Sequence, residues 1–405
     1  MNQTPSAPRL TPVVLSGTTA FLGLYATQPL LPFLARTFHA STLEVSLTVT
    51  AGTLGVALAA PVVGRLADRV GRKRVIVFAA FALATASLLA ATSASLWQLI
   101  AWRFLQGVFT PGVFAVTIAY IHEQWPSSRA GAATAAYVSG TVVGGFAGRV
   151  VAGVVAADVT WRTSFVALGA ITLAAAWYLG ARLPADRPHA RAPREASRFT
   201  AVLDLLRNPQ LTSAYAVGFG VLFSLVAMFT YVTFLLAAPP YGFSTIELGS
   251  VFVVYLVGAA ITPFVGPIID RHGHRRGVAV AAAFGIVGAL LTLAGNLPAI
   301  LAGLATCATG VFIAQAAATS HVASAARQDR GLAVGLYATC YYVGGSAGGS
   351  LPALFWARWG WPACVLLVVA VQAAIAVVSI AWWADARGPR PADPAGTDRR
   401  PEWYH

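Results

Sequence analysis

Two arginines stand inside otherwise apolar stretches of the sequence, where a cation could bind a charged solute. Arg103 lies in LIAWRFLQGVFTPG, residues 99–112, and Arg149 lies in SGTVVGGFAGRVVAG, residues 139–153. A charged side chain within a membrane is costly and usually marks a functional site, although an arginine can also extend its charged end to the membrane surface. We predict that Arg103 and Arg149 recognise the charge of a solute.

Polar side chains in other apolar stretches could complete such a site. We expect the following residues to line it: Gln28, Gln106, Gln315 and Tyr231. Gln106 follows Arg103 by three positions and therefore shares its helix face, whereas the other three are chosen by position alone and could equally serve packing. All 14 Asp and Glu residues fall in loops, tails or helix ends. The region would then be positive, which disfavours lipophilic cations and favours anionic, zwitterionic or polar neutral solutes.

Three residues could carry protons through the protein: Glu44, Glu247 and His122. Each glutamate opens an apolar segment, and histidine is the side chain that ordinarily titrates near neutral pH. His122 and His321 end two apolar segments in roughly corresponding positions. This correspondence favours the alternative that both are hydrogen-bonded residues at helix ends.

The sequence offers no metal site and no cofactor site. His272 and His274 are close in sequence, but Arg271 and the pair Arg275 and Arg276 would repel a metal ion. The three cysteines fall inside apolar segments without the spacing of metal ligands. No catalytic group of residues lies at a common depth, so we predict that the protein is not an enzyme.

A short basic turn occurs twice in the chain. The first copy is GRLADRVGRKR, residues 64–74, and the second is GPIIDRHGHRR, residues 266–276, which begins 202 positions later. The glycine-rich stretch from residue 139 recurs 200 positions later as TCYYVGGSAGGSLPA, and Glu44 and Glu247 are 203 positions apart. Because these offsets agree, the sequence indicates an internal duplication.

Membrane helices must hold these residues in place. The chain of 405 residues is 57% hydrophobic and 10% charged, whereas soluble domains carry about 25% charged residues. Twelve apolar segments can be recognised, at about residues 11–34, 43–65, 75–92, 96–120, 131–157, 161–181, 210–237, 246–268, 277–294, 298–321, 331–356 and 361–383. Most reach the roughly 20 residues that span a bilayer. We predict an all-α membrane protein with twelve transmembrane helices in two pseudo-symmetric six-helix bundles.

The predicted parts of the chain follow from these segments: a cytoplasmic N-terminal tail at 1–10, a first bundle at 11–182, a cytoplasmic linker at 183–208, a second bundle at 209–384 and a cytoplasmic C-terminal tail at 385–405. With the N-terminus placed in the cytoplasm, only Arg36, Arg162 and Arg358 of the 27 Lys and Arg residues lie outside, and two more lie within helices. This bias follows the positive-inside rule. The net charge of +13 therefore reports orientation, with both termini cytoplasmic, and no nucleic-acid partner is expected.

This arrangement of six plus six helices, with a basic loop after the second helix of each half, resembles the major facilitator superfamily over about residues 11–385. The residues that match the family's loop signature are Gly64, Asp68, Arg69, Gly71, Arg72 and Lys73, repeated as Gly266, Asp270, Arg271, Gly273 and Arg275. Leu99, Arg103, Gln106 and Gly107 match the motif that drug/proton antiporters carry in helix four.

The antiporter motif of helix five is not matched. It ends Gly-Pro-x-x-Gly-Gly, but its proline is replaced by Gly145 and its last glycine by Arg149. The overall pattern, including YATQPLLP and VGGFAGR, is most similar to the YnfM-type branch of bacterial efflux permeases.

The resemblance implies alternating access, in which two halves rock about a central site near the bilayer midplane. It also implies a conformational latch, in which Gly64 lets helix two approach helix eleven and Asp68 meets the N-terminal end of helix eleven near Gly331. Asp270 would meet the start of helix five near Gly131 in the same way. A carboxylate at such a position is stabilised by about 0.3 to 1 kcal/mol. A lipid-facing anchor is the alternative; it accounts for the arginines but not for the acid.

We therefore expect a monomeric secondary transporter of the bacterial inner membrane, whose partners are a small-molecule solute, protons and the lipid bilayer. Proton-coupled export of a small organic solute is the preferred function. Uptake or facilitated diffusion of an organic anion is the alternative.

Overall fold

The computed structural model describes residues 9–186, 198–326 and 329–383, and in these ranges the regular elements are all helices. The elements before the first gap are α1 (Thr11–Leu22), the short 3-10 helix η1 (Gln28–Leu30), α2 (Leu31–Phe38), α3 (Thr42–Val70), α4 (Arg72–Ala91), α5 (Leu96–Gln124), α6 (Ser127–Asp158) and α7 (Trp161–Arg182). Those after it are α8 (Arg198–Arg207), α9 (Pro209–Ala237), α10 (Thr245–Val251), α11 (Val254–His272), α12 (His274–Leu291), α13 (Leu297–Ala325) and α14 (Arg330–Trp382).

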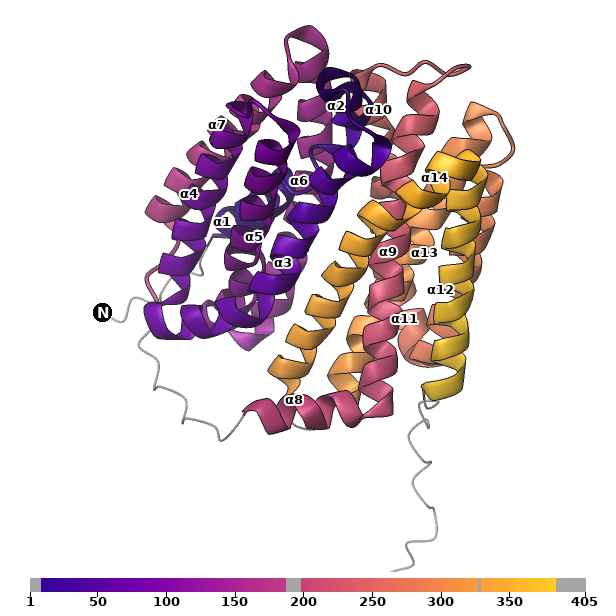
Figure 1. Ribbon diagram of the computed structural model, residues 1–405. Coiled ribbons are helices and arrows are strands. Elements are labelled where there is room, and N and C mark those ends of the chain that lie inside the picture. The colour runs from indigo at the N-terminus through magenta and orange to yellow at the C-terminus, as the bar shows by residue number, and fades with distance from the viewer. Residues whose placement is uncertain (1–8, 187–197, 327–328, 384–405) are drawn as a thin grey trace, which may run out of the picture.

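Figure 1 shows α1 to α7 grouped on one side of the molecule and α9 to α14 on the other; we refer to these groups as the first and second halves. The lower end in Figure 1 carries α8 and both basic turns, one between α3 and α4 and one between α11 and α12. We name it the basic end. The upper end, with α2 and α10, is the opposite end. Most of the two predicted tails and the middle of the predicted linker, residues 1–8, 187–197 and 384–405, lie outside the described residues.

Nine helices in the described part of the chain are long and apolar enough to cross a membrane. One of them, α14, has 53 residues, and Gly360 interrupts it with a φ of 65° and a ψ of −154°. A straight helix of that length would measure about 80 Å, but Figure 1 shows the element turn back near the opposite end. The protein is therefore an all-helical membrane protein, as predicted; the count of twelve spans stays a prediction.

Two further apolar stretches are each divided into shorter pieces. α1 ends at Leu22, and the chain then passes through turns before η1 and α2 begin. Pro29 and Pro32 stand within the first two positions of these helices, where the missing N–H leaves no intrahelical bond unmade. The second interruption separates α10 from α11 at Phe252 and Val253. No proline marks it, and the sequence did not predict it.

The predicted duplication is visible in matching local structures. Ser41 with Glu44, and Ser244 with Glu247, form equivalent capping boxes that begin α3 and α10. Gly71 and Gly273, with φ angles of 107° and 89°, are the N-cap residues directly before α4 and α12. Both glycines adopt positive φ, which a side chain would disfavour.

Glycines also set the closest helix crossing of each half. A Cβ on Gly148 of α6 would stand 1.8 Å from the carbonyl oxygen of Leu22 in α1. A Cβ on Gly348 of α14 would stand 2.3 Å from the carbonyl oxygen of Phe223 in α9. Backbones this close require a residue without a side chain. The offset of 200 in the sequence thus relates two equivalent helix crossings.

Candidate functional site

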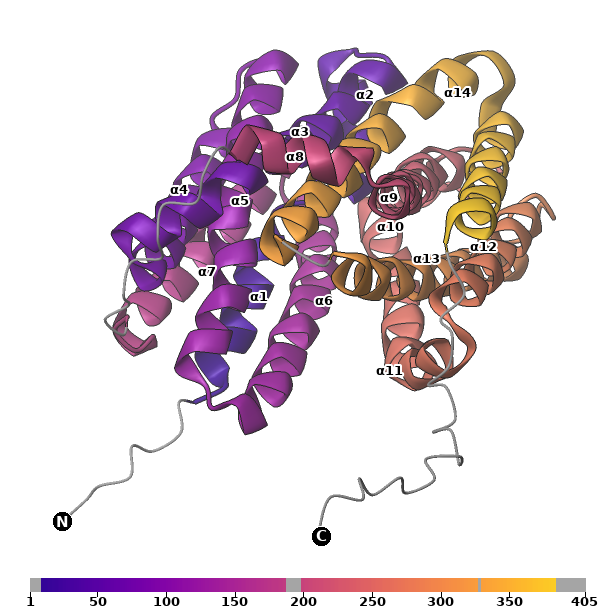
Figure 2. The same ribbon diagram turned by 90° about the horizontal axis from the view of Figure 1, so that it is seen from below.

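A cavity of about 420 Å³ lies between the two halves. Its lining residues come from α1, α5 and α6 on one side and from α9, α11, α13 and α14 on the other, together with Tyr25 from the turn after α1. Figure 2, seen from the basic end, shows α6 of the first half facing α13 of the second across the middle of the molecule. Six tyrosines line the cavity: Tyr25, Tyr137, Tyr255, Tyr337, Tyr341 and Tyr342. Among the described residues that line it, none is Asp, Glu or His.

Hydrogen bonds between the halves close the cavity toward the opposite end. Gln28 Nε2 donates to Thr230 Oγ1 at 3.1 Å, and Thr245 Oγ1 donates to the carbonyl oxygen of Gly153 at 2.9 Å. Near the basic end, a Cβ on Gly131 or Gly331 would meet nothing within 4 Å. The halves therefore touch at the opposite end, whereas near the basic end the starts of α6 and α14 have open space beside these two glycines.

Arg149 lies where the two interrupted helices meet. Its guanidinium carbon is 4.9 Å from the centre of the Tyr25 ring, 4.5 Å from that of Phe252 and 5.0 Å from that of Tyr255. Tyr25 belongs to the turn after α1, and Phe252 and Tyr255 flank the break between α10 and α11. The interruptions thus supply the aromatic faces that hold the cation.

Among the described residues, the hydrogen bonds of Arg149 leave its Nη2 without an acceptor. Nε donates to Gln28 Oε1 at 2.8 Å and Nη1 donates to the carbonyl oxygen of Gly145 at 2.6 Å. In the described part of the chain no carboxylate pairs with Arg149, although the residue is only 5% exposed and lines the cavity. The structure thus brings predicted site residues Arg149 and Gln28 together.

Arg103 is placed differently from its prediction. It is fully buried and does not line the cavity. Its Nη1 donates to the carbonyl oxygen of Gly23 at 2.7 Å, its Nη2 to that of Leu24, and its Nε to that of Thr48 at 3.2 Å. Gly23 and Leu24 are the first residues after α1 ends. Arg103 therefore binds carbonyls beside the point where the first helix is interrupted. This contact differs from the charge recognition that we predicted for it.

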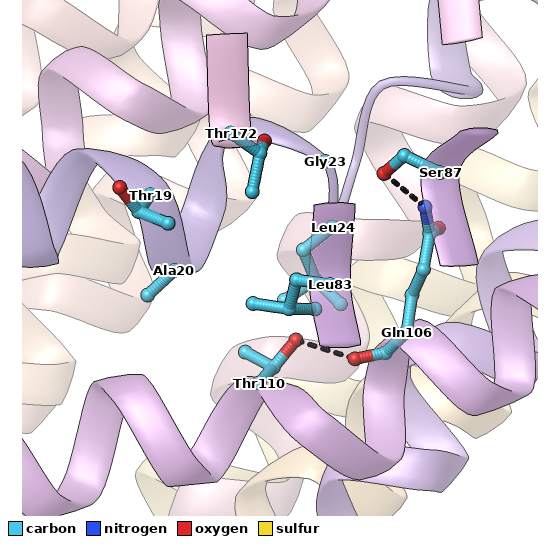
Figure 3. A pocket seen from close by; sticks show the side chains of 9 residues that line it. All are labelled: Thr19, Ala20, Gly23, Leu24, Leu83, Ser87, Gln106, Thr110 and Thr172. Atoms are coloured by element: carbon cyan, nitrogen blue, oxygen red, sulfur yellow. Dashed lines mark hydrogen bonds between the residues drawn. The ribbon is translucent and has the colours of Figure 1, made fainter. Parts of the chain in front are cut away.

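Gln106 lies on the same helix as Arg103 and accepts a hydrogen bond from it. Figure 3 shows Gln106 with its other neighbours, Ser87 and Thr110. Its Oε1 accepts from Arg103 Nη1, and its Nε2 donates to Ser87 Oγ at 2.7 Å. It borders a pocket of about 10 Å³ inside the first half, also lined by Thr19, Thr110 and Thr172. A space of that size suits a single water molecule. Gln106 is therefore also away from the large cavity.

The two other predicted lining residues divide in the same way. Gln315 lines the cavity, and its Oε1 accepts from the hydroxyl of Tyr341 at 2.9 Å. Tyr231 is fully buried outside the lining; its hydroxyl donates to the carbonyl oxygen of Gly349 at 2.8 Å and lies 3.2 Å from Ser46 Oγ of the first half. Position in an apolar segment thus identified a cavity residue in one case and a contact between helices in the other.

Comparison with known proteins agrees with this architecture. The family model described as Major Facilitator Superfamily matches residues 13–261 and 225–404. This chain belongs to the major facilitator superfamily. It is therefore a multi-pass membrane transporter, and the predicted family and helical fold are confirmed.

Relatives of this superfamily member cover most of its length. The inner membrane transport protein YnfM of Escherichia coli (strain K12) is 31% identical over 361 residues, 88% of this chain and 86% of that protein. The MFS-type transporter YybF of Bacillus subtilis (strain 168) is 30% identical over 347 residues, 85% of this chain and 86% of that protein. The crystal structure of the nucleoside transporter NupG (D323A mutant) superposes with a TM-score of 0.75 at 13% identity, covering 93% of this chain and 100% of that one, which shows the shared fold.

The loop signature of the superfamily makes other contacts here than the predicted latch. Asp68 Oδ1 lies 3.3 Å from Arg72 Nη2. Arg72 also forms an ion pair with Glu123 and donates to the carbonyl oxygen of Ala119 at 2.6 Å, which ties α4 to α5. A Cβ on Gly64 would meet nothing within 4 Å. The contact between Asp68 and the start of α14 is not made in this structure and stays a prediction for another conformation.

The second copy of the loop is only partly described. The side-chain contacts of Asp270 and the surroundings of Gly266 lie outside the described residues. Arg271 is exposed and Gly273 is the N-cap residue of α12. The predicted contact of Asp270 with the start of α6 is therefore not tested.

Replacing Asp68 with alanine tests the latch. Its side chain is 64% exposed and pairs only with Arg72 in the described structure, so the substitution should change stability by less than about 1 kcal/mol. If Asp68 holds the halves together at the basic end in another conformation, the initial rate of transport should fall several-fold at unchanged expression. Asp204→Ala on α8, also an exposed acid at the basic end, is the control. Equal rates for Asp68→Ala and the control would show that Asp68 is not a latch.

The predicted proton carriers lie away from the cavity. The carboxylate of Glu44 accepts from the backbone N–H and the hydroxyl of Ser41, and that of Glu247 accepts from the same groups of Ser244. His122 is exposed in the last turn of α5. Both acids therefore act as helix caps in this conformation and do not line the cavity, and their role in proton transfer stays a prediction.

Two parts of the site escaped the sequence analysis. The aromatic residues around Arg149 lie far apart in the sequence, and only the YATQPLLP stretch, with two prolines close behind Tyr25, hinted at one of them. Asp186 follows α7, and its Oδ1 accepts from the backbone N–H of Lys73 at 2.9 Å. It therefore caps α4 at the basic turn. Its place in the predicted linker gave no sign of that contact.

Proposed function

We propose that this transporter exports a small organic solute by alternating access, driven by a proton gradient. The observation that carries the proposal is the cavity between the halves, closed at the opposite end and bordered by both halves along its length. Rocking of the halves would exchange the open and closed ends around it. The size of the cavity, about 420 Å³, is that of a site for one small molecule.

The distribution of charge limits the solutes. Arg149 is the one charged residue among the described residues that line the cavity. A positive cavity favours anionic, zwitterionic or polar neutral solutes and repels lipophilic cations. The basic end would face the cytoplasm of a bacterium, in accord with the positive-inside rule. In that orientation the cavity would receive solute from the cytoplasm, and we propose that the protein acts in the inner membrane as a monomer.

One observation favours a second candidate. No Asp, Glu or His lies among the described lining residues of the cavity, so the protein offers no obvious group there to exchange protons with the solute. Uptake by symport or facilitated diffusion of an organic anion would need no such group if the solute carried the proton or moved down its own gradient. Direction and coupling can be separated by one flux experiment.

Purified protein should be reconstituted into liposomes whose lumen is more acidic than the bath. A proton-coupled exporter exchanges lumenal protons for external solute, so a labelled organic anion should accumulate in the lumen severalfold over protein-free liposomes. A permeant weak acid behaves oppositely, because its neutral form equilibrates and its anion collects on the alkaline side. Faster equilibration with the bath, without accumulation and at a rate independent of the imposed gradient, would instead support a facilitator. Exclusion from the acidic lumen beyond that of protein-free liposomes would support a symporter.

A further inference from the structure

Arg149 presents a buried positive charge that has no counter-charge among the residues that the structure describes. It is 5% exposed, and its partners are a glutamine side chain, a backbone carbonyl and three aromatic rings. Aromatic faces attract a cation, but they do not neutralise it. A buried charge is costly unless it is paired, so the site is arranged to accept an anion.

The chemistry around Arg149 suits a carboxylate. Its Nη2 makes no hydrogen bond to any residue that the structure describes. The hydroxyls of Tyr25, Tyr255 and Tyr342, which border the same cavity, likewise donate to no described group. A guanidinium edge and phenolic donors that border one cavity can together bind the oxygens of a carboxylate through charge-assisted hydrogen bonds. No second cation lines the described cavity, since Arg103 is bound to backbone carbonyls elsewhere. A solute with one negative charge is therefore enough to balance Arg149.

The rest of the cavity suits a flat apolar body. Beyond the six tyrosines, its lining includes Phe21, Phe114, Phe146 and Phe312. Aromatic side chains pack favourably against planar rings in stacked or edge-to-face geometry. An aliphatic solute would fill the same volume without that contribution.

We propose that the solute is a monoanionic carboxylate attached to a planar ring system, with its carboxylate on Arg149 and its ring among the aromatic residues of the cavity. This inference rests on the proposed function for the assumption that the cavity is the solute site. Arg149 acts as the specificity-determining residue, and its departure from the glycine of the antiporter motif sets the charge of the accepted solute.

Binding to the purified protein tests the inference directly. Isothermal titration calorimetry should be run with benzoate, 1-naphthoate and indole-3-acetate, and with 1-naphthamide as a neutral molecule of the same shape. We expect 1-naphthoate to bind at least tenfold more tightly than 1-naphthamide. Arg149→Gln should weaken carboxylate binding about 10- to 100-fold, as expected for the loss of hydrogen bonds to a charged group. Tyr342→Phe should weaken it a few-fold.

Arg162→Gln is the matched control. Arg162 also lies over an aromatic ring, with its guanidinium carbon 4.4 Å from the centre of the Trp161 ring, but it does not line the cavity. Its removal should leave carboxylate affinity unchanged. If Arg149→Gln does not fold, the ratio of 1-naphthoate to 1-naphthamide affinity in the unmodified protein decides the question.

Equal binding of acid and amide, unchanged affinity in a folded Arg149→Gln protein, or no binding by any of the three carboxylates would overturn the inference. Carboxylate binding without flux would support the inference and contradict the proposed transport. Flux of a neutral or cationic solute, without carboxylate binding, would support transport and contradict the inference.

Discussion

Replacing Arg103 with methionine should prevent the transporter from folding, whereas replacing Arg149 with glutamine should not. Arg103 donates to three backbone carbonyls, and that of Leu24 accepts from no backbone N–H in the described part of the chain. A hydrogen bond to a charged group contributes about 1.5 to 3 kcal/mol. Methionine would fill part of the same space but lose all of these bonds, and the carbonyl of Leu24 would lose its arginine donor. The loss is large against a typical folding stability of about 5 to 15 kcal/mol.

Each detergent-solubilised variant should be examined by size-exclusion chromatography. The thermal unfolding of those variants that are monodisperse should then be measured. Arg103→Lys should be intermediate, because one ammonium group cannot reach three carbonyls in the geometry of a guanidinium fork. Arg149→Gln is the comparison, because Arg149 donates to only one described backbone carbonyl, that of Gly145. A monodisperse Arg103→Met protein with unchanged unfolding temperature and lost solute binding would restore the role that the sequence suggested.

The contrast between the two arginines shows how far sequence reasoning reaches. Both stand in apolar helices, and composition alone gives both the same interpretation. They differ because the first helix breaks after Leu22, which exposes carbonyls beside Arg103, while the cavity opens beside Arg149. Pro29 and Pro32 mark the interruption in the sequence, but they do not show which side chain binds the carbonyls of Gly23 and Leu24. The sequence therefore predicts that a cation is buried more readily than it predicts which groups the cation binds.

Features that depend on backbone geometry were easier to predict. The basic turns at Gly71 and Gly273 were predicted from a short pattern that repeats at nearly constant offset. Ser41 with Glu44 and Ser244 with Glu247 belong to the same repeat, but their glutamates were interpreted as possible proton carriers and not as helix caps. The family follows from the same repeats. The tyrosines of the cavity come from distant parts of the sequence and meet only in the folded protein, so their spacing in the sequence does not predict that they line one cavity. Long-range contacts are what the sequence leaves undetermined.

The helix interruptions explain why the site lies where it does. Tyr25 and Gln28 come from the interrupted first helix, and Phe252 and Tyr255 come from the interruption between α10 and α11. Irregular backbone within a membrane is tolerated where it is buried in protein or borders a cavity. Arg149 connects the two interruptions through its ring contacts and its bond to Gln28, whose amide donates to Thr230 in the second half. A solute that binds Arg149 would act directly on a contact that closes the opposite end.

The close crossing of α1 and α6 supports this arrangement and gives the second large prediction. Gly148→Ala should destabilise the protein strongly, because the added carbon would stand 1.8 Å from the carbonyl oxygen of Leu22, a backbone atom that cannot rotate away. Separating two packed helices by even part of an ångström loses contacts along their length, at a cost of about 1 to 3 kcal/mol or more. Leu22 is also the last residue of α1, so the displacement would reach the break that Arg103 stabilises.

Gly131→Ala on the same helix is the matched control, and it should change stability in the other direction. A Cβ there would meet nothing within 4 Å, and alanine favours a helix by about 1 kcal/mol over glycine. Gly348→Ala should behave like Gly148→Ala, because its Cβ would stand 2.3 Å from the carbonyl oxygen of Phe223. Thermal unfolding in detergent gives all three values. Since the gain in helix propensity is common to every substitution, a Gly148→Ala protein as stable as Gly131→Ala would mean that α1 and α6 do not cross here at backbone contact. Close backbone contact would then not explain why glycine occurs at both of these helix crossings.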